Sequence, residues 1–280
     1  MERPARPDAG WEYNRMGGVR RAIEQRSGKS SPVLFSALTE SINREMKIID
    51  IVGWAEVAKA MDKLAKRNAE WFPQGFNGIH AVSNPEFFAA TREGAFYFSN
   101  ADELVSGFKP ASLLVQAMEK AKAGEMLSFH EEYAVETLWH EIMHNLTSIR
   151  AVKIKLGKES LEEGLIQMAS RYSYPSLLNE MGGTENNRSR IIENGYAYPR
   201  TARNLVEMSR LSGIDSETIA KVLIDYGQQW RPVLTEKFSE GLNIKQERIQ
   251  TLYGHAVEKP LQDFIEKIRV LARNAPRSIP

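Results

Sequence analysis

Cysteine is absent from this 280-residue chain, and its absence removes several classes of protein from consideration. A chain without cysteine has no disulfide framework, no thiolate zinc finger and no cysteine nucleophile. Any metal site must therefore be built from nitrogen and oxygen ligands, which histidine and the acidic residues supply.

An excess of either charge is also absent, because 37 basic residues balance 36 acidic residues and leave a net charge of +1. This balance gives no electrostatic indication of binding to nucleic acid or to an anionic membrane. No apolar run is long enough to span a membrane. The residues that follow Met1 also lack the apolar core of a secretory signal. We expect a cytoplasmic protein, unless the chain is a piece of a longer one.

A hydrophobic share of 42% and a charged share of 26% are typical of a folded chain. Residues 1–32 mix proline, glycine, arginine and serine without an apolar period, which predicts a loose N-terminal arm. We expect residues 33–148 to contain the N-terminal helices and a small sheet. Residues 149–280 are expected to form a helical C-terminal part.

Apolar residues at three- and four-residue steps predict a helix over residues 54–71. Residues 79–82 and 95–99 predict two strands of a small sheet, with a turn just before the second. Pro110 suits the first turn of another helix, which Gly124 ends. From residue 201 onward the pattern predicts only helices, with breaks near Gly213, Gly241 and Gly254.

His140, Glu141 and His144 form the motif HExxH inside a segment that is predicted to be helical. Ser128 and Glu131 have the spacing of a capping box at its start, and an apolar stripe follows them. Histidines four residues apart lie about one turn apart on one face, so both can reach one metal ion. Glu141 points to a neighbouring direction, where it can act as a general base on an attacking water. Imidazole and carboxylate ligands favour zinc.

The motif needs a third protein ligand, and Glu162 and Glu163 are the candidates in the next predicted helix, which begins at Ser160. The spacing from Ser160 to Glu163 also fits a capping box, in which Glu163 would only bind the free amides of the helix start. Glu162 lies nearer the apolar face, toward which a ligand must point. The residues alone leave these alternatives open, and the HExxH pattern itself can also arise by chance.

The run Glu163-Gly164-Leu165-Ile166 begins 19 positions after His144, and with it the sequence resembles the gluzincins, the zincin peptidases that include thermolysin. In that group the third ligand is a glutamate on a later helix, commonly followed by a small residue and then by apolar residues. The resemblance covers residues 128–172 and implies that Glu163 is the third zinc ligand. Gln167, one turn later on the same face, can orient a ligand histidine.

The fold implied by this resemblance is α+β and zincin-like. It is mostly helical, with a small mixed sheet beside the HExxH helix and a helical C-terminal part. In zincins an edge strand of the sheet binds the extended substrate, and residues 95–99 are the candidate for that strand.

The activity implied is zinc-dependent hydrolysis of a protein or peptide substrate, in which Glu141 takes a proton from the attacking water and passes it to the leaving nitrogen. The reaction also needs a donor to the oxyanion, and Tyr196, Tyr198 and Arg200 are candidates in a loop-like segment. These aromatic residues can instead serve only in packing, and His255 is a further candidate that we favour less.

Two other functions fit the same motif. The first is a zincin-like binding or structural module without turnover, against which the intact Glu141 argues. The second is a zinc hydrolase of a non-peptide substrate, because the motif specifies an activated water and not the group that it attacks.

Overall fold

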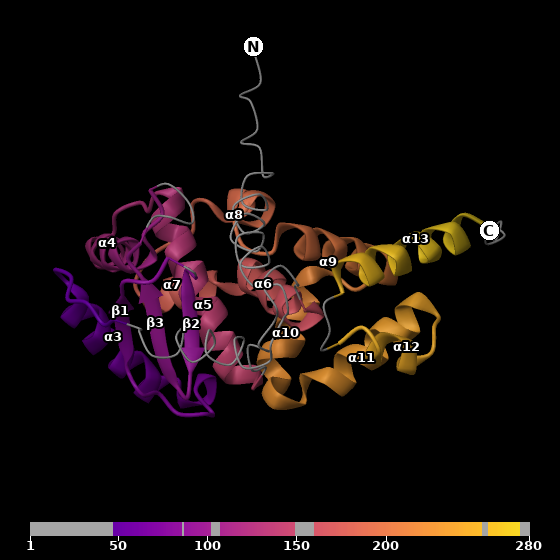
Figure 1. Ribbon diagram of the computed structural model, residues 1–280, viewed down its shortest axis with the longest axis horizontal. Coiled ribbons are helices and arrows are strands. Elements are labelled where there is room, and N and C mark those ends of the chain that lie inside the picture. The colour runs from indigo at the N-terminus through magenta and orange to yellow at the C-terminus, as the bar shows by residue number, and fades with distance from the viewer. Residues whose placement is uncertain (1–46, 86, 102–106, 149–159, 254–256, 275–280) are drawn as a thin grey trace, which may run out of the picture. The chain divides into compact units, whose positions relative to one another are not determined.

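Three short strands and a series of helices make up the described part of the chain (Figure 1). The computed structural model describes residues 47–85, 87–101, 107–148, 160–253 and 257–274. The expected N-terminal arm, residues 1–32, and His255 lie outside these residues. The described residues are mostly helical with one small mixed sheet, which confirms the expected α+β class. None of their helices is long and apolar enough to cross a membrane.

The sheet consists of β1 (Ile79–Val82), β2 (Ala89–Arg92) and β3 (Ala95–Ser99), in the order β1-β3-β2. β1 is parallel to β3 and β2 is antiparallel to it. Glu93 and Gly94 join β2 to β3, and both have positive φ, at 52° and 78°. Two such residues are typical of a type I′ hairpin turn, which matches the twist of the strands that it connects.

The two strands predicted from the sequence are confirmed, but the role expected of the second is wrong. β3 pairs with β1 on one side and with β2 on the other, so it is the central strand and has no open edge for a substrate. β2, which the sequence analysis missed, pairs only with β3 among the described residues. The sheet edge beside α5 (Phe129–Thr147) therefore belongs to β2.

The helices agree with the predicted pattern over most of their length. The predicted helix over residues 54–71 is confirmed as α3 followed by one 3-10 turn, and Gly124 ends α4 as expected. Pro175 starts a short helix of its own after α6, since proline is tolerated at the first helical position. Up to residue 194 the remaining helices are α3 (Trp54–Arg67), η1 (Ala69–Trp71), α4 (Pro110–Ala123), α6 (Leu161–Ser173), α7 (Pro175–Glu180) and α8 (Arg188–Asn194).

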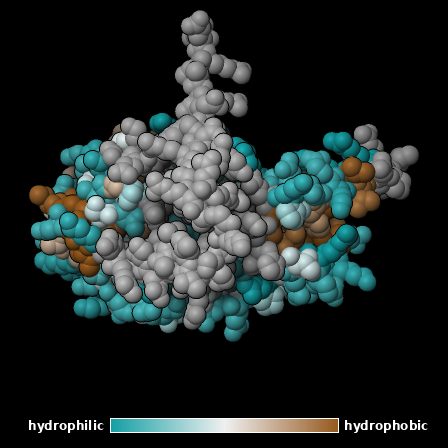
Figure 2. Space-filling view, viewed as in Figure 1, coloured by the Kyte–Doolittle hydropathy of each residue, from teal (hydrophilic) through white to brown (hydrophobic). Residues whose placement is uncertain are grey.

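The C-terminal part is helical, as predicted, with Gly213 in the left-handed region at the end of α9. Gly227 marks one further break that was not predicted. The helices are α9 (Pro199–Ser212), α10 (Ser216–Tyr226), η2 (Gly227–Gln229), α11 (Trp230–Leu242), α12 (Gln246–Gln250) and α13 (Glu258–Asn274). Figure 2 shows apolar side chains at the surface beside α13, where Val270 and Leu271 are exposed.

Helix α5 lies at the centre of this arrangement and carries the HExxH motif. It begins with the predicted capping box, because the Ser128 hydroxyl accepts from the Glu131 amide and the Glu131 carboxylate accepts from the Ser128 amide. All its residues from Glu131 to Thr147 are buried. α4, α6, α10 and β2 all contact it, so the motif lies buried between helices and the sheet.

Helix α6 approaches α9 closely at Gly164. A Cβ atom on this residue would lie 2.2 Å from Cγ2 of Thr201 and 3.0 Å from Cδ1 of Leu205. Only glycine permits this distance between the two helices. Gly164 follows Glu163 directly, so this close contact lies next to the residue that faces α5.

We expect Gly164→Ala to lower the free energy of unfolding by about 1–3 kcal/mol, since overpacking outweighs the better helix propensity of alanine. Thr201→Ser removes the methyl group nearest to the added Cβ and should recover part of this loss in the double variant. Urea unfolding of the single and double variants measures both effects. Full stability of Gly164→Ala would contradict the close packing.

Candidate metal centre

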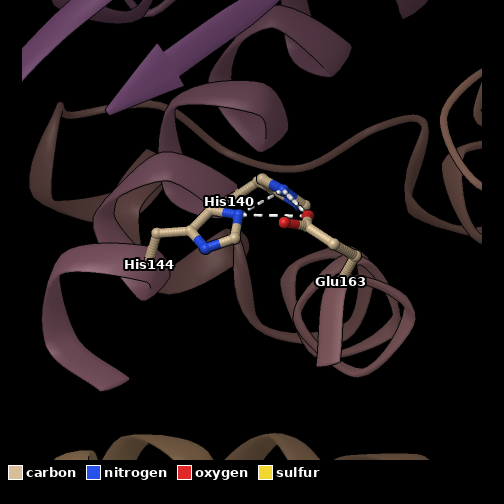
Figure 3. A group of neighbouring side chains, drawn as sticks. All are labelled: His140, His144 and Glu163. Atoms are coloured by element: carbon tan, nitrogen blue, oxygen red, sulfur yellow. Dashed lines mark hydrogen bonds and ion pairs between the residues drawn. The ribbon is translucent and has the colours of Figure 1, made fainter. Parts of the chain in front are cut away.

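His140 and His144 face the same point from one side of α5 (Figure 3). Their Nε2 atoms are 3.0 Å apart and their ring planes are inclined by 70°. Both side chains are buried, at 6% and 7% exposure. The predicted one-turn separation of the two imidazoles is thus confirmed, and the two nitrogens converge as a pair of metal ligands would.

Glu163 completes the group from helix α6. Its Oε2 atom lies 3.3 Å from Nε2 of His144 and 3.7 Å from Nε2 of His140 (Figure 3). The Ser160 hydroxyl accepts the backbone N–H of Glu163 at 3.0 Å, so one half of the capping box is present. The Glu163 carboxylate, however, points to the histidines. The capping alternative therefore accounts for the backbone of Glu163 but not for its side chain.

Glu162 is directed elsewhere, although it is equally buried. Its carboxylate forms an ion pair with Arg231 of α11. Of the two carboxylates that the sequence left open, the structure brings only Glu163 to the histidines. The two side chains point in different directions because adjacent residues on a helix are about 100° apart.

The electrostatics of the group favour a charged carboxylate. Burial alone would raise the pKa of Glu163, but the charges of His144 and His140 and their hydrogen bonds hold it well below its ordinary value. An anionic oxygen and two imidazole nitrogens therefore face one another inside the protein. Such a set of donors is suited to a divalent cation.

The positions of the donor atoms also fit a metal ion. One ligand atom from each of His140, His144 and Glu163 lies within 4.8 Å of the others, and no second group of this kind occurs in the part of the chain that the structure describes. The three residues can therefore hold a metal ion. This arrangement comes from two helices, α5 and α6, that pack directly on each other.

The partner of His140 on the side away from this centre differs from the expectation. Its Nδ1 atom is buried and has no hydrogen-bond partner among the described residues. The interpretation of Gln167 as the direct partner of a ligand histidine is therefore wrong. The Gln167 side-chain amide instead donates to Oε1 of Glu136 at 2.7 Å. Gln167 is therefore hydrogen-bonded to a carboxylate on α5 and not to a histidine.

Glu141 contacts the sheet through Thr91. The hydroxyl of Thr91, on β2, lies 2.7 Å from Oε2 of Glu141 and 3.3 Å from its backbone oxygen. Glu141 is 6% exposed. It does not join the three candidate ligands, which agrees with the separate role expected of it. Thr91 was missed because nothing in the sequence indicated that a strand lay over residues 89–92.

The structure separates the candidate oxyanion donors. The ring of Tyr198 lies parallel to that of His140, with centroids 6.1 Å apart and planes inclined by 13°. Tyr196 instead lies in an aromatic cluster, and its hydroxyl is 2.7 Å from Nε2 of His130. Arg200 is exposed in the first turn of α9. Tyr198 is thus the candidate that lies beside His140.

Tyr198 is held in an unfavourable backbone conformation. Its φ angle of 48° lies in the left-handed region, which an aromatic residue rarely adopts. Arg171 of α6 donates to the carbonyl oxygens of Gly195 and Ala197 at 2.9 and 2.6 Å, and the Tyr133 hydroxyl accepts from the Ala197 amide at 2.9 Å. These bonds fix the segment that leads into Tyr198. The sequence analysis did not identify this contact of Arg171.

Two acidic residues extend the polar face of α5 beyond the histidines. Glu132, Glu136, His140 and His144 follow at four-residue steps, and all are buried. Glu132 accepts hydrogen bonds from the amide and side chain of Asn187, among others. The sequence contains this four-residue spacing, but the sequence analysis considered only the apolar stripe of the same helix.

The pKa of the Glu136 side chain is raised, which favours a neutral carboxyl. Burial raises its pKa to about 8, although Arg171 and the hydrogen bond from Gln167 act in the opposite direction; the charge of Glu141 adds to the increase. The raised pKa favours a protonated carboxyl at Glu136, one turn before His140, at neutral pH.

Comparison of the chain with protein-family models, curated proteins and solved structures finds no significant match in any of the three. The interpretation of the site therefore depends on its residues and their geometry.

We expect Glu163→Ala to weaken the binding of a divalent ion such as Zn²⁺ or Co²⁺ by more than about 100-fold, since losing even an indirect partner of a ligand costs about 10- to 100-fold. Glu162→Ala is the matched control, and it should lose the ion pair to Arg231 but keep the metal. Competition with a chromophoric chelator measures both affinities. Equal affinity in the two variants would return Glu163 to a capping role.

We also expect Glu136→Gln to change the pH dependence of stability in metal-free protein. The ordinary pKa of 4.5 applies when the chain is unfolded, whereas the folded value is about 8. The stabilisation from a neutral Glu136 is complete below about 4.5 and is lost as the pH rises toward about 8. As the pH rises through this window, the melting temperature of the wild type should therefore fall relative to that of the variant. Parallel melting curves from pH 4.5 to 8 would contradict the raised pKa.

Proposed function

We propose that this protein is a zinc-dependent metallopeptidase of the gluzincin type. The observation that carries the proposal is the convergence of His140, His144 and Glu163, from two helices, on one buried point. The small mixed sheet beside the motif helix supports it further.

Zinc is the ion that we propose for this centre. Two neutral imidazoles and one carboxylate, with no thiolate available in the chain, match the ligand set of catalytic zinc sites. When bound, zinc supplies Lewis acidity, which makes water a stronger acid and polarises a carbonyl group. His140, His144 and Glu163 would hold it.

Glu141 is the general base of the proposed reaction. Its carboxylate accepts a proton from the attacking water and then delivers that proton to the leaving nitrogen of the peptide. The position of Glu141 beside the ligand histidines, but outside the ligand group, suits this role. Its burial favours proton transfer within the site, because bulk water is kept from competing.

Tyr198 and β2 are the parts that we assign to substrate. The Tyr198 ring lies beside His140, so its hydroxyl is the candidate donor to the developing oxyanion, in place of Tyr196. β2 is the strand with an edge beside the motif helix, and an extended peptide can add to such an edge through backbone hydrogen bonds. The substrate class is therefore a protein or an extended peptide.

We expect Glu141→Gln to keep the fold and the zinc while lowering the rate of hydrolysis by at least about 100-fold, since the amide is nearly isosteric but cannot accept the proton. The assay offers unfolded casein and also follows self-cleavage, with and without chelator. Zinc content and melting temperature are measured on the same samples.

Comparable cleavage by Glu141→Gln and wild type would remove Glu141 from the general-base role. A wild-type protein that binds zinc but cleaves neither casein nor itself would instead favour a binding module or a non-peptide substrate. Loss of activity with chelator and its return on adding zinc completes the test.

A further inference from the structure

Thr91 of β2 forms a hydrogen bond with the proposed general base on the neighbouring helix α5. Its Oγ1 lies 2.7 Å from Oε2 of Glu141, a distance typical of a strong bond between a hydroxyl and a carboxylate. The hydroxyl donates, because an ionised carboxylate only accepts. The bond joins two segments that are 50 residues apart in the chain.

The backbone around Thr91 makes its hydroxyl a rigid donor. Thr91 pairs with Phe96 of β3 in an antiparallel ladder, and the tight turn at Glu93-Gly94 closes that hairpin. A β-branched side chain also has few accessible rotamers. The hydroxyl therefore has a fixed position relative to α5, and the flexible glutamate side chain must adapt to it.

A fixed donor at one carboxylate oxygen determines what the other oxygen can do. Glu141 has three side-chain torsions, and without a partner its carboxylate would sample several directions. The bond from Thr91 at Oε2 restricts these torsions and leaves Oε1 to accept a proton. A general base reacts well only when it is held within hydrogen-bond reach of the proton that it abstracts.

We propose that Thr91 is a positioning residue, which orients the Glu141 carboxylate so that Oε1 accepts the proton of the attacking water. This inference rests on the proposed hydrolase function. It goes beyond that function in assigning β2 a part in the chemistry, in addition to its proposed place beside the substrate.

Three variants test the inference in zinc-loaded protein. Thr91→Val has nearly the same shape but no hydroxyl, Thr91→Ser restores the hydroxyl, and Thr137→Val is the matched control. The Thr137 hydroxyl is also buried on the motif helix, but it donates to the backbone of Tyr133 at 2.9 Å and has no bond to Glu141.

We expect Thr91→Val to lower kcat for casein by about 10- to 100-fold, the range for losing a hydrogen bond to a charged group. KM and the zinc affinity should stay within about twofold of wild type, because Thr91 is not a ligand. Thr91→Ser should recover most of the lost kcat. Thr137→Val should keep its kcat, whatever its effect on the melting temperature.

A second measurement needs no substrate. The melting temperatures of Thr91→Val, Glu141→Ala and the double variant are compared in metal-free protein, and the two losses should be less than additive because the residues share one bond. Strict additivity would overturn the contact itself.

The outcomes separate this inference from the proposed function. If the wild type cleaves casein and Thr91→Val cleaves it equally well, the positioning role is wrong and the hydrolase proposal stands. Equal loss of kcat in the valine and serine variants would also overturn the positioning role. If the zinc-loaded wild type cleaves neither casein nor itself, the metallopeptidase proposal fails, and the positioning role in peptide hydrolysis fails with it.

Discussion

The site depends on one buried carboxylate, that of Glu163, held between two imidazoles. An ionised carboxylate is costly to bury unless it is paired and hydrogen-bonded. His140 and His144 supply that pairing, and their charges and hydrogen bonds outweigh the burial of Glu163. The pairing in turn requires α5 and α6 to pack directly on each other. On another side of α6, Gly164 lets α9 approach closely.

Helix α5 illustrates how a core can carry polar groups when each has a partner. Buried between helices and the sheet, it still places Glu132, Glu136 and the two histidines on one face. Hydrogen bonds offset the free energy of burying these polar groups. Amide groups donate to Glu132 and Glu136, and the Thr91 hydroxyl donates to Glu141. Each of these buried polar groups has a protein partner or lies beside another polar group of the same face, so the helix carries them without leaving isolated charges in the core.

Local features of the site could be predicted from the sequence, and long-range ones could not. The capping box at Ser128 and the HExxH spacing are local, so they fixed a helix with both histidines on one face. Glu163 was separated from Glu162 only by a family resemblance, and the structure then showed Arg231 of a distant helix pairing with Glu162. The strand over residues 89–92 was not predicted because its alanines have little β propensity. The central position of β3 was not predicted either, because it depends on strand pairing that no local pattern encodes.

Backbone strain at Tyr198 is the remaining sign that the site is more than a buried cluster. A left-handed tyrosine costs on the order of 1–3 kcal/mol and persists only where surrounding contacts outweigh it. Arg171 supplies those contacts by binding the carbonyl oxygens of Gly195 and Ala197. Because Arg171 lies on the same helix as Glu163, α6 both presents the third candidate ligand and fixes the loop that sets the Tyr198 ring against His140. A conformation retained at this cost, beside three converging donor atoms, is what a preorganised centre requires.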